Sequence, residues 1–344
     1  MSNILPPLPS PGVGARRKGP KTLPRLQFSP GGPNSAASDK FPLAPSPSTV
    51  YPREIVDGRA VVGEDLQKWL TESGAELGEK LSGVVVSVSD TDIAASQKKI
   101  AELQSLSSKV PIIGASVSVD LSNGVPDALK EISVTSKPRI ALSTTFEQGS
   151  QNSVNALAWA VAQGHVVDID VQANIAPSES GWEALEDYVD KASQAEGGEK
   201  KGTIILSNVL PPPHSLSLPI VKLLTDPSYL TYQSHIASLS LYSHIYLKFV
   251  PPSWGEPTPE ATSKDLSKEA KEWKRRIKMY LGPAVEAFGY QRIIFGTSPS
   301  AGSNVTSNAG HWYEIARLSL AELGVEQEDI DAVFSGNAKR IYGA

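Results

Sequence analysis

Two strongly apolar runs of the sequence contain polar side chains whose types suit catalysis. In residues 165–172, Asp168, Asp170 and Gln172 alternate with aliphatic residues, and alternate residues of a β-strand point to the same face. A later apolar run places Lys248 on the corresponding face by the same alternation. A carboxylate can act as a general base, and an ammonium group can stabilise developing negative charge. Asp170 and Lys248 are therefore the candidate catalytic pair.

The same two residues also have a structural explanation. Isolated buried charges are costly, so an ion pair between Asp170 and Lys248 could be held in the interior for packing reasons alone. We favour this structural interpretation and keep catalysis as the alternative. A nucleophilic arrangement of Ser298 with His311 is disfavoured, because Ser298 lacks a G-x-S-x-G elbow and His311 falls at the start of a predicted helix.

Composition argues against several classes of function. The net charge of -5 provides no basic field for nucleic acid. The chain has no cysteine, so a metal would need histidine and carboxylate ligands, yet no H-x-H or H-E-x-x-H spacing occurs. No apolar run reaches the length of about 18 residues that a membrane span requires. We expect neither nucleic acid nor a membrane as a partner, and the sequence does not specify an oligomeric state.

The N-terminal region differs in composition from the rest. Residues 1–48 are rich in Pro, Gly and Ser, which predicts a disordered tail before a folded domain of residues 49–344. The first 38 residues carry five basic side chains and no acidic one. That bias suits a mitochondrial transit peptide, but the many prolines would break the amphipathic helix that such peptides form. We expect a cytoplasmic protein, with mitochondrial import as the alternative.

Short apolar runs alternate with segments of helical spacing through the folded part. This alternation predicts successive βα units and a parallel sheet. The seven strand candidates are residues 83–88, 110–114, 139–142, 165–171, 203–206, 244–249 and 292–295. Periodicity leaves open a doubly wound sheet or a barrel that lacks one recognisable strand. Nucleotide fingerprints are missing, since Gly12 and Gly14 lie in the tail and Arg17 stands where a third glycine is required.

The C-terminal fifth carries the most specific motifs. Residues 292–299 are RIIFGTSP, and residues 334–342 are FSGNAKRIY. This layout resembles the amidohydrolase-related family of metal-dependent barrel hydrolases, whose last strand usually reads "FGSDWP" and whose closing helix reads "NAKRLYG". Weaker similarity extends from about Leu26 and favours the branch of lactonases and 2-pyrone-4,6-dicarboxylate hydrolases. The resemblance implies an α/β fold, a (β/α)₈ TIM-type barrel whose first strand is distorted.

The resemblance also shows altered metal-ligand positions. In the family, a divalent metal activates water for attack on a lactone, ester or amide carbonyl. The region that corresponds to the H-x-H pair of the first strand, residues 26–30, has no histidine. The later "DH" pair is replaced by Ser207 and Asn208, and the final aspartate is replaced by Ser298. The resemblance therefore implies a barrel without the metal site, and we expect no metal and no cofactor.

Ligand-contacting residues follow from the same comparison. Asp90 and Asp92 occupy the turn after the predicted strand 83–88, which resembles the second strand of the family, and in the family this turn lies near the substrate. Capping of the following helix is the structural explanation for these two aspartates. Such barrels gather their active sites at the C-terminal ends of the strands. The remaining candidate binding residues there are Gln172, Asn208, Thr297 and Ser298.

These observations predict a non-catalytic pseudo-hydrolase that binds a small organic acid or lactone in an amidohydrolase-like barrel. One alternative is a metal-independent hydrolase of a lactone or related small carboxylic-acid derivative, with Asp170 as base and Lys248 as electrophilic stabiliser. A second alternative is a scaffold that acts through its N-terminal tail.

Overall fold

The structure is a computed structural model that describes residues 46–61, 69–71, 73–89, 92–106, 110–175, 179–194, 202–262 and 266–343. The chain divides into two compact units, residues 1–44 and 45–344, and everything below concerns the second unit. Of the predicted tail of residues 1–48, all but the last three residues lie outside the described part of the chain, as does the segment 26–30.

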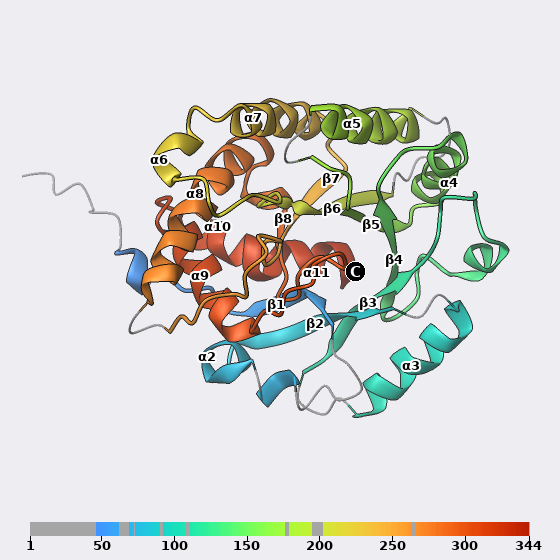
Figure 1. The fold of residues 1–344 in the computed structure, drawn as a ribbon. Helices are drawn as coiled ribbons and strands as arrows, with labels where there is room; N and C mark the ends of the chain where they lie inside the picture. Colours follow the sequence, from blue (N-terminus) through green and yellow to red (C-terminus); the bar gives the residue numbers. More distant parts are fainter. Residues whose placement is uncertain are drawn as a thin grey trace, which may run out of the picture. The chain divides into compact units, whose positions relative to one another are not determined.

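Eight parallel strands form a nearly closed barrel, which confirms the predicted (β/α)₈ fold class (Figure 1). Each strand pairs with the next along the chain. The strands are β1 (Ile55–Ala60), β2 (Leu81–Val88), β3 (Ile112–Ser118), β4 (Arg139–Phe146), β5 (Val166–Val171), β6 (Thr203–Leu210), β7 (Ile245–Phe249) and β8 (Ile293–Phe295). Strands β2 to β8 are the seven predicted ones. The first strand, β1, was not predicted.

Helices surround the barrel and follow most of the strands (Figure 1). The α-helices are α2 (Gly74–Gly78), α3 (Ile93–Leu106), α4 (Gln151–Ala162), α5 (Glu179–Ser193), α6 (Ile220–Leu223), α7 (Pro227–Ser240), α8 (Lys268–Phe288), α9 (Ala309–Ala321), α10 (Gln327–Asp331) and α11 (Asn337–Tyr342). The short turns are the 3₁₀ segments η1 (Pro47–Thr49), η2 (Asp127–Glu131) and η3 (Tyr290–Arg292), and the π-helical η4 (Ala332–Gly336).

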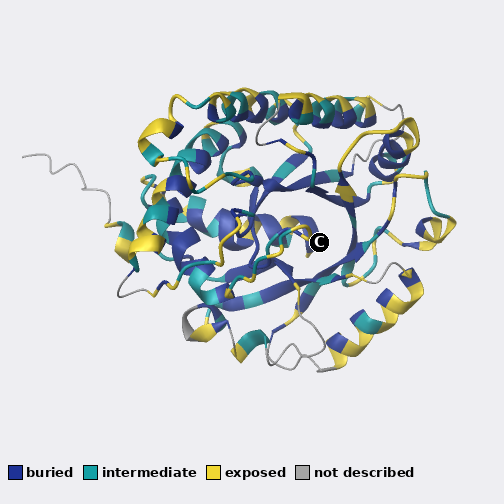
Figure 2. Cartoon of the chain, viewed as in Figure 1, coloured by how far each residue is buried: buried dark blue, intermediate teal, exposed yellow. Residues whose placement is uncertain are grey.

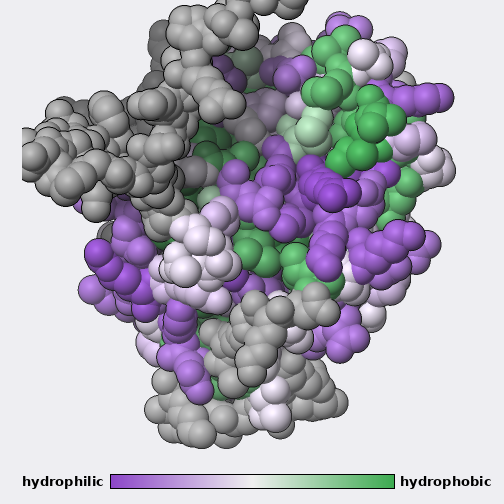
Figure 3. Space-filling model, turned by 90° about the vertical axis from the view of Figure 1, so that its left-hand side faces the viewer, coloured by the Kyte–Doolittle hydropathy of each residue, from purple (hydrophilic) through white to green (hydrophobic). Residues whose placement is uncertain are grey.

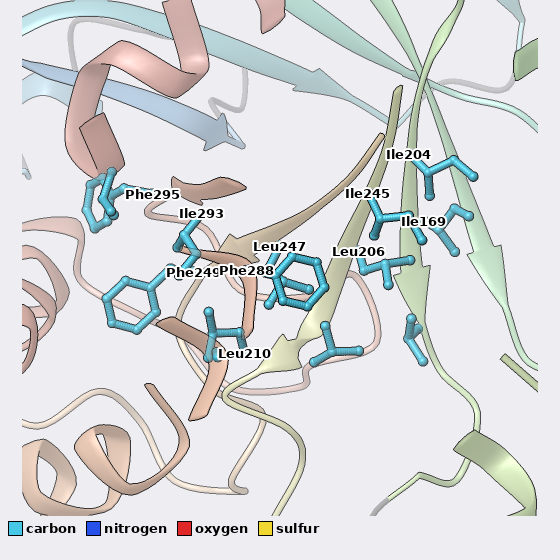
Figure 4. Close-up of a cluster of buried hydrophobic side chains, with 14 of the residues drawn as sticks. Ile169, Ile204, Leu206, Leu210, Ile245, Leu247, Phe249, Phe288, Ile293 and Phe295 are labelled. Atoms are coloured by element: carbon cyan, nitrogen blue, oxygen red, sulfur yellow. The ribbon is translucent and has the colours of Figure 1, made fainter. Parts of the chain in front are cut away.

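The main core lies between the strands and the surrounding helices. Ile169, Leu206 and Leu247 lie on the outer face of neighbouring strands and pack with Phe288 of α8 (Figure 4). The strands are mostly buried, whereas the surrounding helices are exposed on their outer sides (Figure 2). The alternation predicted for 165–172 is confirmed, because the aliphatic residues at 167, 169 and 171 belong to this outer core.

A second, smaller apolar cluster fills the N-terminal end of the barrel. Inward-facing residues of six strands, among them Val56 and Val85, contact Ala338, Ile341 and Tyr342 of α11. The helix comes so close that a Cβ atom on Gly114 of β3 would lie 2.9 Å from the Cβ of Tyr342. This end of the barrel is therefore closed by apolar packing, and polar chemistry is confined to the middle and the C-terminal end.

The junction of β1 and β8 completes the barrel and explains why β1 was missed. Its sequence is IVDGRA, in which Asp57, Gly58 and Arg59 interrupt the apolar run. A Cβ atom on Gly58 would lie 2.6 Å from the Cγ2 of Ile294 and 2.7 Å from the carbonyl oxygen of Phe295. Glycine therefore permits the close approach of the two strands. Ser298 N–H then donates to the carbonyl of Arg59 at 3.0 Å.

The surface mixes hydrophilic and hydrophobic side chains on the face shown in Figure 3. Exposed large apolar side chains include Val221 and Leu224, at and just after α6, and Leu230 on α7. None of the described helices combines the length and apolar character needed to cross a membrane.

Candidate functional site

A buried ion pair lies in the middle of the barrel. Lys248 of β7 is 0% exposed and donates to Asp168 of β5, which is 1% exposed. Ser207 of β6 donates to the other carboxylate oxygen of Asp168 at 2.9 Å. The inward orientation predicted for both residues is confirmed, but the predicted partner is wrong, because Lys248 pairs with Asp168 rather than with Asp170.

The reason for this different pairing is the tilt of the strands. The hydrogen-bonded registers place Lys248 level with Asp170 along the ladders, since Asp170 pairs with Ser207 and the preceding Leu206 pairs with Leu247. In a TIM barrel, strand tilt shifts residues of equal height by about one residue per strand. Two strands therefore shift the partner by about two residues, from Asp170 to Asp168.

Asp170 has a different cation and is fully hydrogen-bonded. Arg59 of β1 donates its Nη2 to Asp170 Oδ2 at 2.9 Å. Ala301 N–H donates to the same Oδ2 at 2.7 Å. Gln172 Nε2 and Ser300 Oγ donate to Oδ1 at 2.7 and 2.6 Å. Four donors occupy most of the acceptor sites of this carboxylate and leave little room for a hydrogen bond from a substrate. This environment favours the structural interpretation of Asp170.

A third buried carboxylate, Asp57, joins β1 to the end of β8. Its Oδ1 accepts from the backbone N–H groups of Arg59 and Thr297, each at 2.9 Å, and its other oxygen accepts from the Thr297 hydroxyl. Thr297 was predicted to bind ligand, and the structure engages its hydroxyl in this contact. Asp57 and Arg59 are two residues apart, the spacing of the H-x-H pair that the resemblance led us to seek in residues 26–30. The first strand of the described barrel is β1, so the search for that pair in residues 26–30 was wrong and the corresponding positions lie on β1.

The charges inside the barrel are close to balanced. Burial lowers the pKa of Lys248 from its usual value, and the Asp168 carboxylate opposes this effect. Burial raises the pKa of Asp57 above its usual value, despite its three donors. Arg59 and Lys248 therefore face the two carboxylates of Asp170 and Asp168, with Asp57 adding a charge only when it ionises. No unbalanced cation is left among these five groups.

A cavity of about 790 Å³ opens at the C-terminal end of the barrel. Nine of its twenty described lining residues are serines. They are Ser73 before α2, Ser87 of β2 and Ser89 just after it, Ser116 and Ser118 of β3, Ser143 of β4, and Ser298, Ser300 and Ser307 of the loop between β8 and α9. Arg59 is the only ionisable residue among the described lining residues, and Trp69 is the only aromatic one. Thr297 and Ser298 line this cavity, as expected for residues at the end of the last strand.

Two buried polar atoms in the cavity wall lack a partner in the described structure. The Nε of Arg59 and the Oγ of Ser116 make no hydrogen bond with described residues. Ser116 is 2% exposed and Arg59 is 5% exposed. An unpaired buried polar atom is costly, so such atoms indicate that water or a ligand completes their hydrogen bonds.

A second cavity of about 290 Å³ includes other predicted binding residues. Gln172, Asn208 and Gly302 line it together with Ser253, whose buried Oγ lacks a partner in the described structure. Asn208 has φ 64°, a left-handed conformation that is strained for a side chain other than glycine. Its Nδ2 donates to the Val171 carbonyl at 2.7 Å, which orients the amide.

Of the remaining predicted residues, those that the structure describes take no part in the interior ion pairs. Asp92 is exposed and accepts from the Ala94 N–H at 2.9 Å, so it caps α3. Asp90 lies outside the described residues. Ser298 Oγ accepts from Val61 N–H at 2.9 Å, whereas His311, inside the first turn of α9, accepts from Ala261 N–H at 3.3 Å. Ser298 and His311 therefore engage separate backbone groups.

The barrel is similar to solved structures of two bacterial proteins. An amidohydrolase from Burkholderia multivorans matches with a TM-score of 0.54 and 16% identity, over 84% of this chain and 99% of that one. A 2-pyrone-4,6-dicarboxylic acid hydrolase, described as putative, from Pseudomonas putida matches with a TM-score of 0.51 and 14% identity, over 85% and 98%. This chain has the amidohydrolase barrel fold. No family model and no curated protein sequence matches it.

The amidohydrolase fold raises the question of a metal, since a second structure of the Burkholderia protein contains zinc (TM-score 0.53, 15% identity, over 84% of this chain and 99% of that one). In the described ranges, no group of three or more His, Cys, Asp or Glu side chains could hold a metal ion. Asp168 and Asp170 are bonded to Lys248 and Arg59 instead. A divalent cation placed between them would face two fixed positive charges. Among the described residues, the interior carboxylates therefore do not suit a metal.

Sequence reasoning missed Asp57, Arg59 and Ser116. A usable signal existed for the first two, because two polar residues at i and i+2 inside an apolar run indicate inward-facing positions on a strand. Ser116 carried no signal, because a single serine in an apolar strand is unremarkable.

Proposed function

We propose that this protein is a non-catalytic, small-molecule-binding pseudo-hydrolase with an amidohydrolase-type barrel. Its interior ion pairs stand where the fold would otherwise supply a reactive centre, and its cavity at the C-terminal end holds the ligand. The observation that carries the proposal is the pairing of both cations with interior carboxylates, Arg59 with Asp170 at 2.9 Å and Lys248 with Asp168.

Catalysis needs a group that changes its protonation or its bonding during the reaction. Lys248 is 0% exposed and does not line either described cavity, so it cannot reach a ligand there. Asp170 is 1% exposed and already accepts four hydrogen bonds. Both residues suit a rigid wall better than a reacting pair. Binding needs only the cavity and its unpaired polar atoms, which are present.

The proposal is tested on the purified full-length protein by metal analysis and by turnover. We expect zinc, manganese and iron far below one ion per chain, with or without prior incubation with these ions. We also expect no turnover of a panel of lactones and esters. Stoichiometric metal, together with turnover that a chelator abolishes, would overturn the proposal.

The metal-independent hydrolase gives a different result in the same assay. Turnover without bound metal that persists after chelation, and that is lost in Asp170→Asn, would replace the binding function with this alternative. Asp127→Asn is the matched control, because Asp127 is an exposed aspartate of η2 whose carboxylate bonds to Lys130 at 2.8 Å. Its loss is not expected to change turnover.

A further inference from the structure

Resting on the proposed binding function, we infer that the ligand of the large cavity is an uncharged, hydroxyl-rich molecule of mono- to disaccharide size. The inference rests on the composition of the described cavity wall, on its two unpaired polar atoms and on the charge balance beside it.

The wall offers many groups that can both donate and accept hydrogen bonds. A serine hydroxyl provides one donor and two acceptor sites and can rotate to suit its partner. The hydroxyls of a sugar or polyol have the same dual capacity, so a surface of serines complements them without imposing charge. The nine serines among the twenty described lining residues give the cavity this character.

Trp69 adds an apolar platform to this polar wall. It is half-buried, packs against the main core on one side and lines the cavity. A sugar ring has apolar C–H faces and a polar rim, and an aromatic ring covers such a face while leaving the rim free. The combination of a single tryptophan with surrounding hydroxyls therefore suits a pyranose-like ring.

The charged groups beside the cavity disfavour an acidic ligand. Arg59 is the only ionisable group of the described wall, and its Nη2 already bonds to Asp170 at 2.9 Å. An anion at Arg59 would approach that carboxylate as well. The unpaired Nε of Arg59 can still donate to a neutral oxygen, and the unpaired Ser116 Oγ lies in the same wall. A ligand hydroxyl or ring oxygen would satisfy both atoms and displace water.

Size also fits this class. A cavity of about 790 Å³ lies within the range of about 300 to 1,000 Å³ that is typical of small-molecule sites. A monosaccharide has about twelve non-hydrogen atoms, and typical binding energy per atom predicts a dissociation constant on the order of 1 mM. The assay must therefore detect weak binding.

The experiment compares neutral probes with matched acids at neutral pH. Saturation-transfer NMR and calorimetry are applied to glucose, galactose, maltose and sorbitol, and to gluconate, glucuronate and glucose 6-phosphate. We expect at least one neutral probe to bind, with its acidic counterpart weaker. Trp69→Leu should weaken that binding about tenfold, and Ser116→Ala about three- to tenfold.

Trp159→Leu is the matched control for Trp69→Leu. Trp159 is also half-buried, but it lies on α4 beside His165 and does not line the described cavity. Its loss should leave the dissociation constant unchanged, and binding that falls equally in both tryptophan variants would overturn the assignment. Binding of the acids alone, or of none of these probes, would also overturn the ligand class. The proposed function fails separately, on bound metal or on turnover.

Discussion

Replacing Lys248 by methionine tests whether the interior charges behave as one unit. Lys248→Met keeps much of the apolar volume but leaves Asp168 buried, with Ser207 as its remaining side-chain donor. Breaking one side of a buried pair costs about 3–5 kcal/mol. At about 2–4 °C per kcal/mol for a domain of 150–250 residues, the midpoint of thermal unfolding should fall on the order of 10 °C.

The decisive measurement is a double-mutant cycle. Asp168→Asn alone leaves Lys248 without its carboxylate and should cost a similar amount, about 3–5 kcal/mol. The double variant carries no buried charge at this pair and should lose only about 1–3 kcal/mol, the cost of an amide with unmade hydrogen bonds. The two losses would then be coupled by at least about 3 kcal/mol, measured by urea unfolding. Additivity within about 0.5 kcal/mol would refute the reasoning, because independent sites behave in that way.

Three further perturbations address the seam, the third carboxylate and the cavity wall. Gly58→Ala should cost about 1–3 kcal/mol because its Cβ would lie 2.6 Å from Ile294 and 2.7 Å from the Phe295 backbone. The control is Gly78→Ala at the end of α2, where a Cβ would meet only the Leu70 carbonyl at 3.9 Å, and it should cost nothing or stabilise by up to about 1 kcal/mol in the same urea titration. Equal effects of the two alanines would contradict the close approach of β1 and β8. Burial raises the pKa of Asp57 above its unfolded value of 3.8, so its contribution to stability is full below that pH and is lost as the pH rises through the raised pKa. Asp57→Asn cannot ionise and should gain stability relative to the wild type as the pH rises from about 4 to 8, and a difference independent of pH would argue against the raised pKa. Gly302→Ala would place a Cβ 1.9 Å from Gln172 Oε1 and displace the amide from Asp170 and Ser300. It should cost about 1–3 kcal/mol in unfolding experiments that again use Gly78→Ala as the control, and a loss below about 0.5 kcal/mol would mean that the amide is not held there.

Seven of the eight strands could be predicted because each carries an uninterrupted or alternating apolar pattern. Strand β1 could not, since Asp57, Gly58 and Arg59 break the run and each serves a tertiary contact. Asp57 bonds to Thr297, which is 240 residues away, and Arg59 bonds to Asp170, which is 111 residues away. Local pattern carries no information about such partners. The glycine between them is required by the approach of β8, which is also invisible in the local sequence.

The sequence predicted which side chains face the barrel interior, but it did not predict which of them form ion pairs. Alternation correctly directed Asp168, Asp170 and Lys248 into the barrel, because the period of a strand is a local property. The pairing of Lys248 with Asp168 depends on the stagger between strands, which only the closed barrel defines. The cavity is formed from serines on β2, β3, β4 and the loop after β8. Each serine is ordinary in its own segment, so the wall emerges only when the strands are placed side by side.

The arrangement separates two properties that a metal-dependent barrel combines. Carboxylates in the interior need a positive partner, and either a metal ion or a fixed side chain can provide it. A metal with an open coordination position can also bind and activate water. Arg59 and Lys248 neutralise Asp170 and Asp168 but offer no exchangeable position. The protein's own side chains thus neutralise these interior carboxylates. The cavity at the strand ends still offers space and the unpaired polar atoms of Arg59 and Ser116. The proposed function, a binding site without hydrolytic chemistry, therefore rests on this one set of contacts.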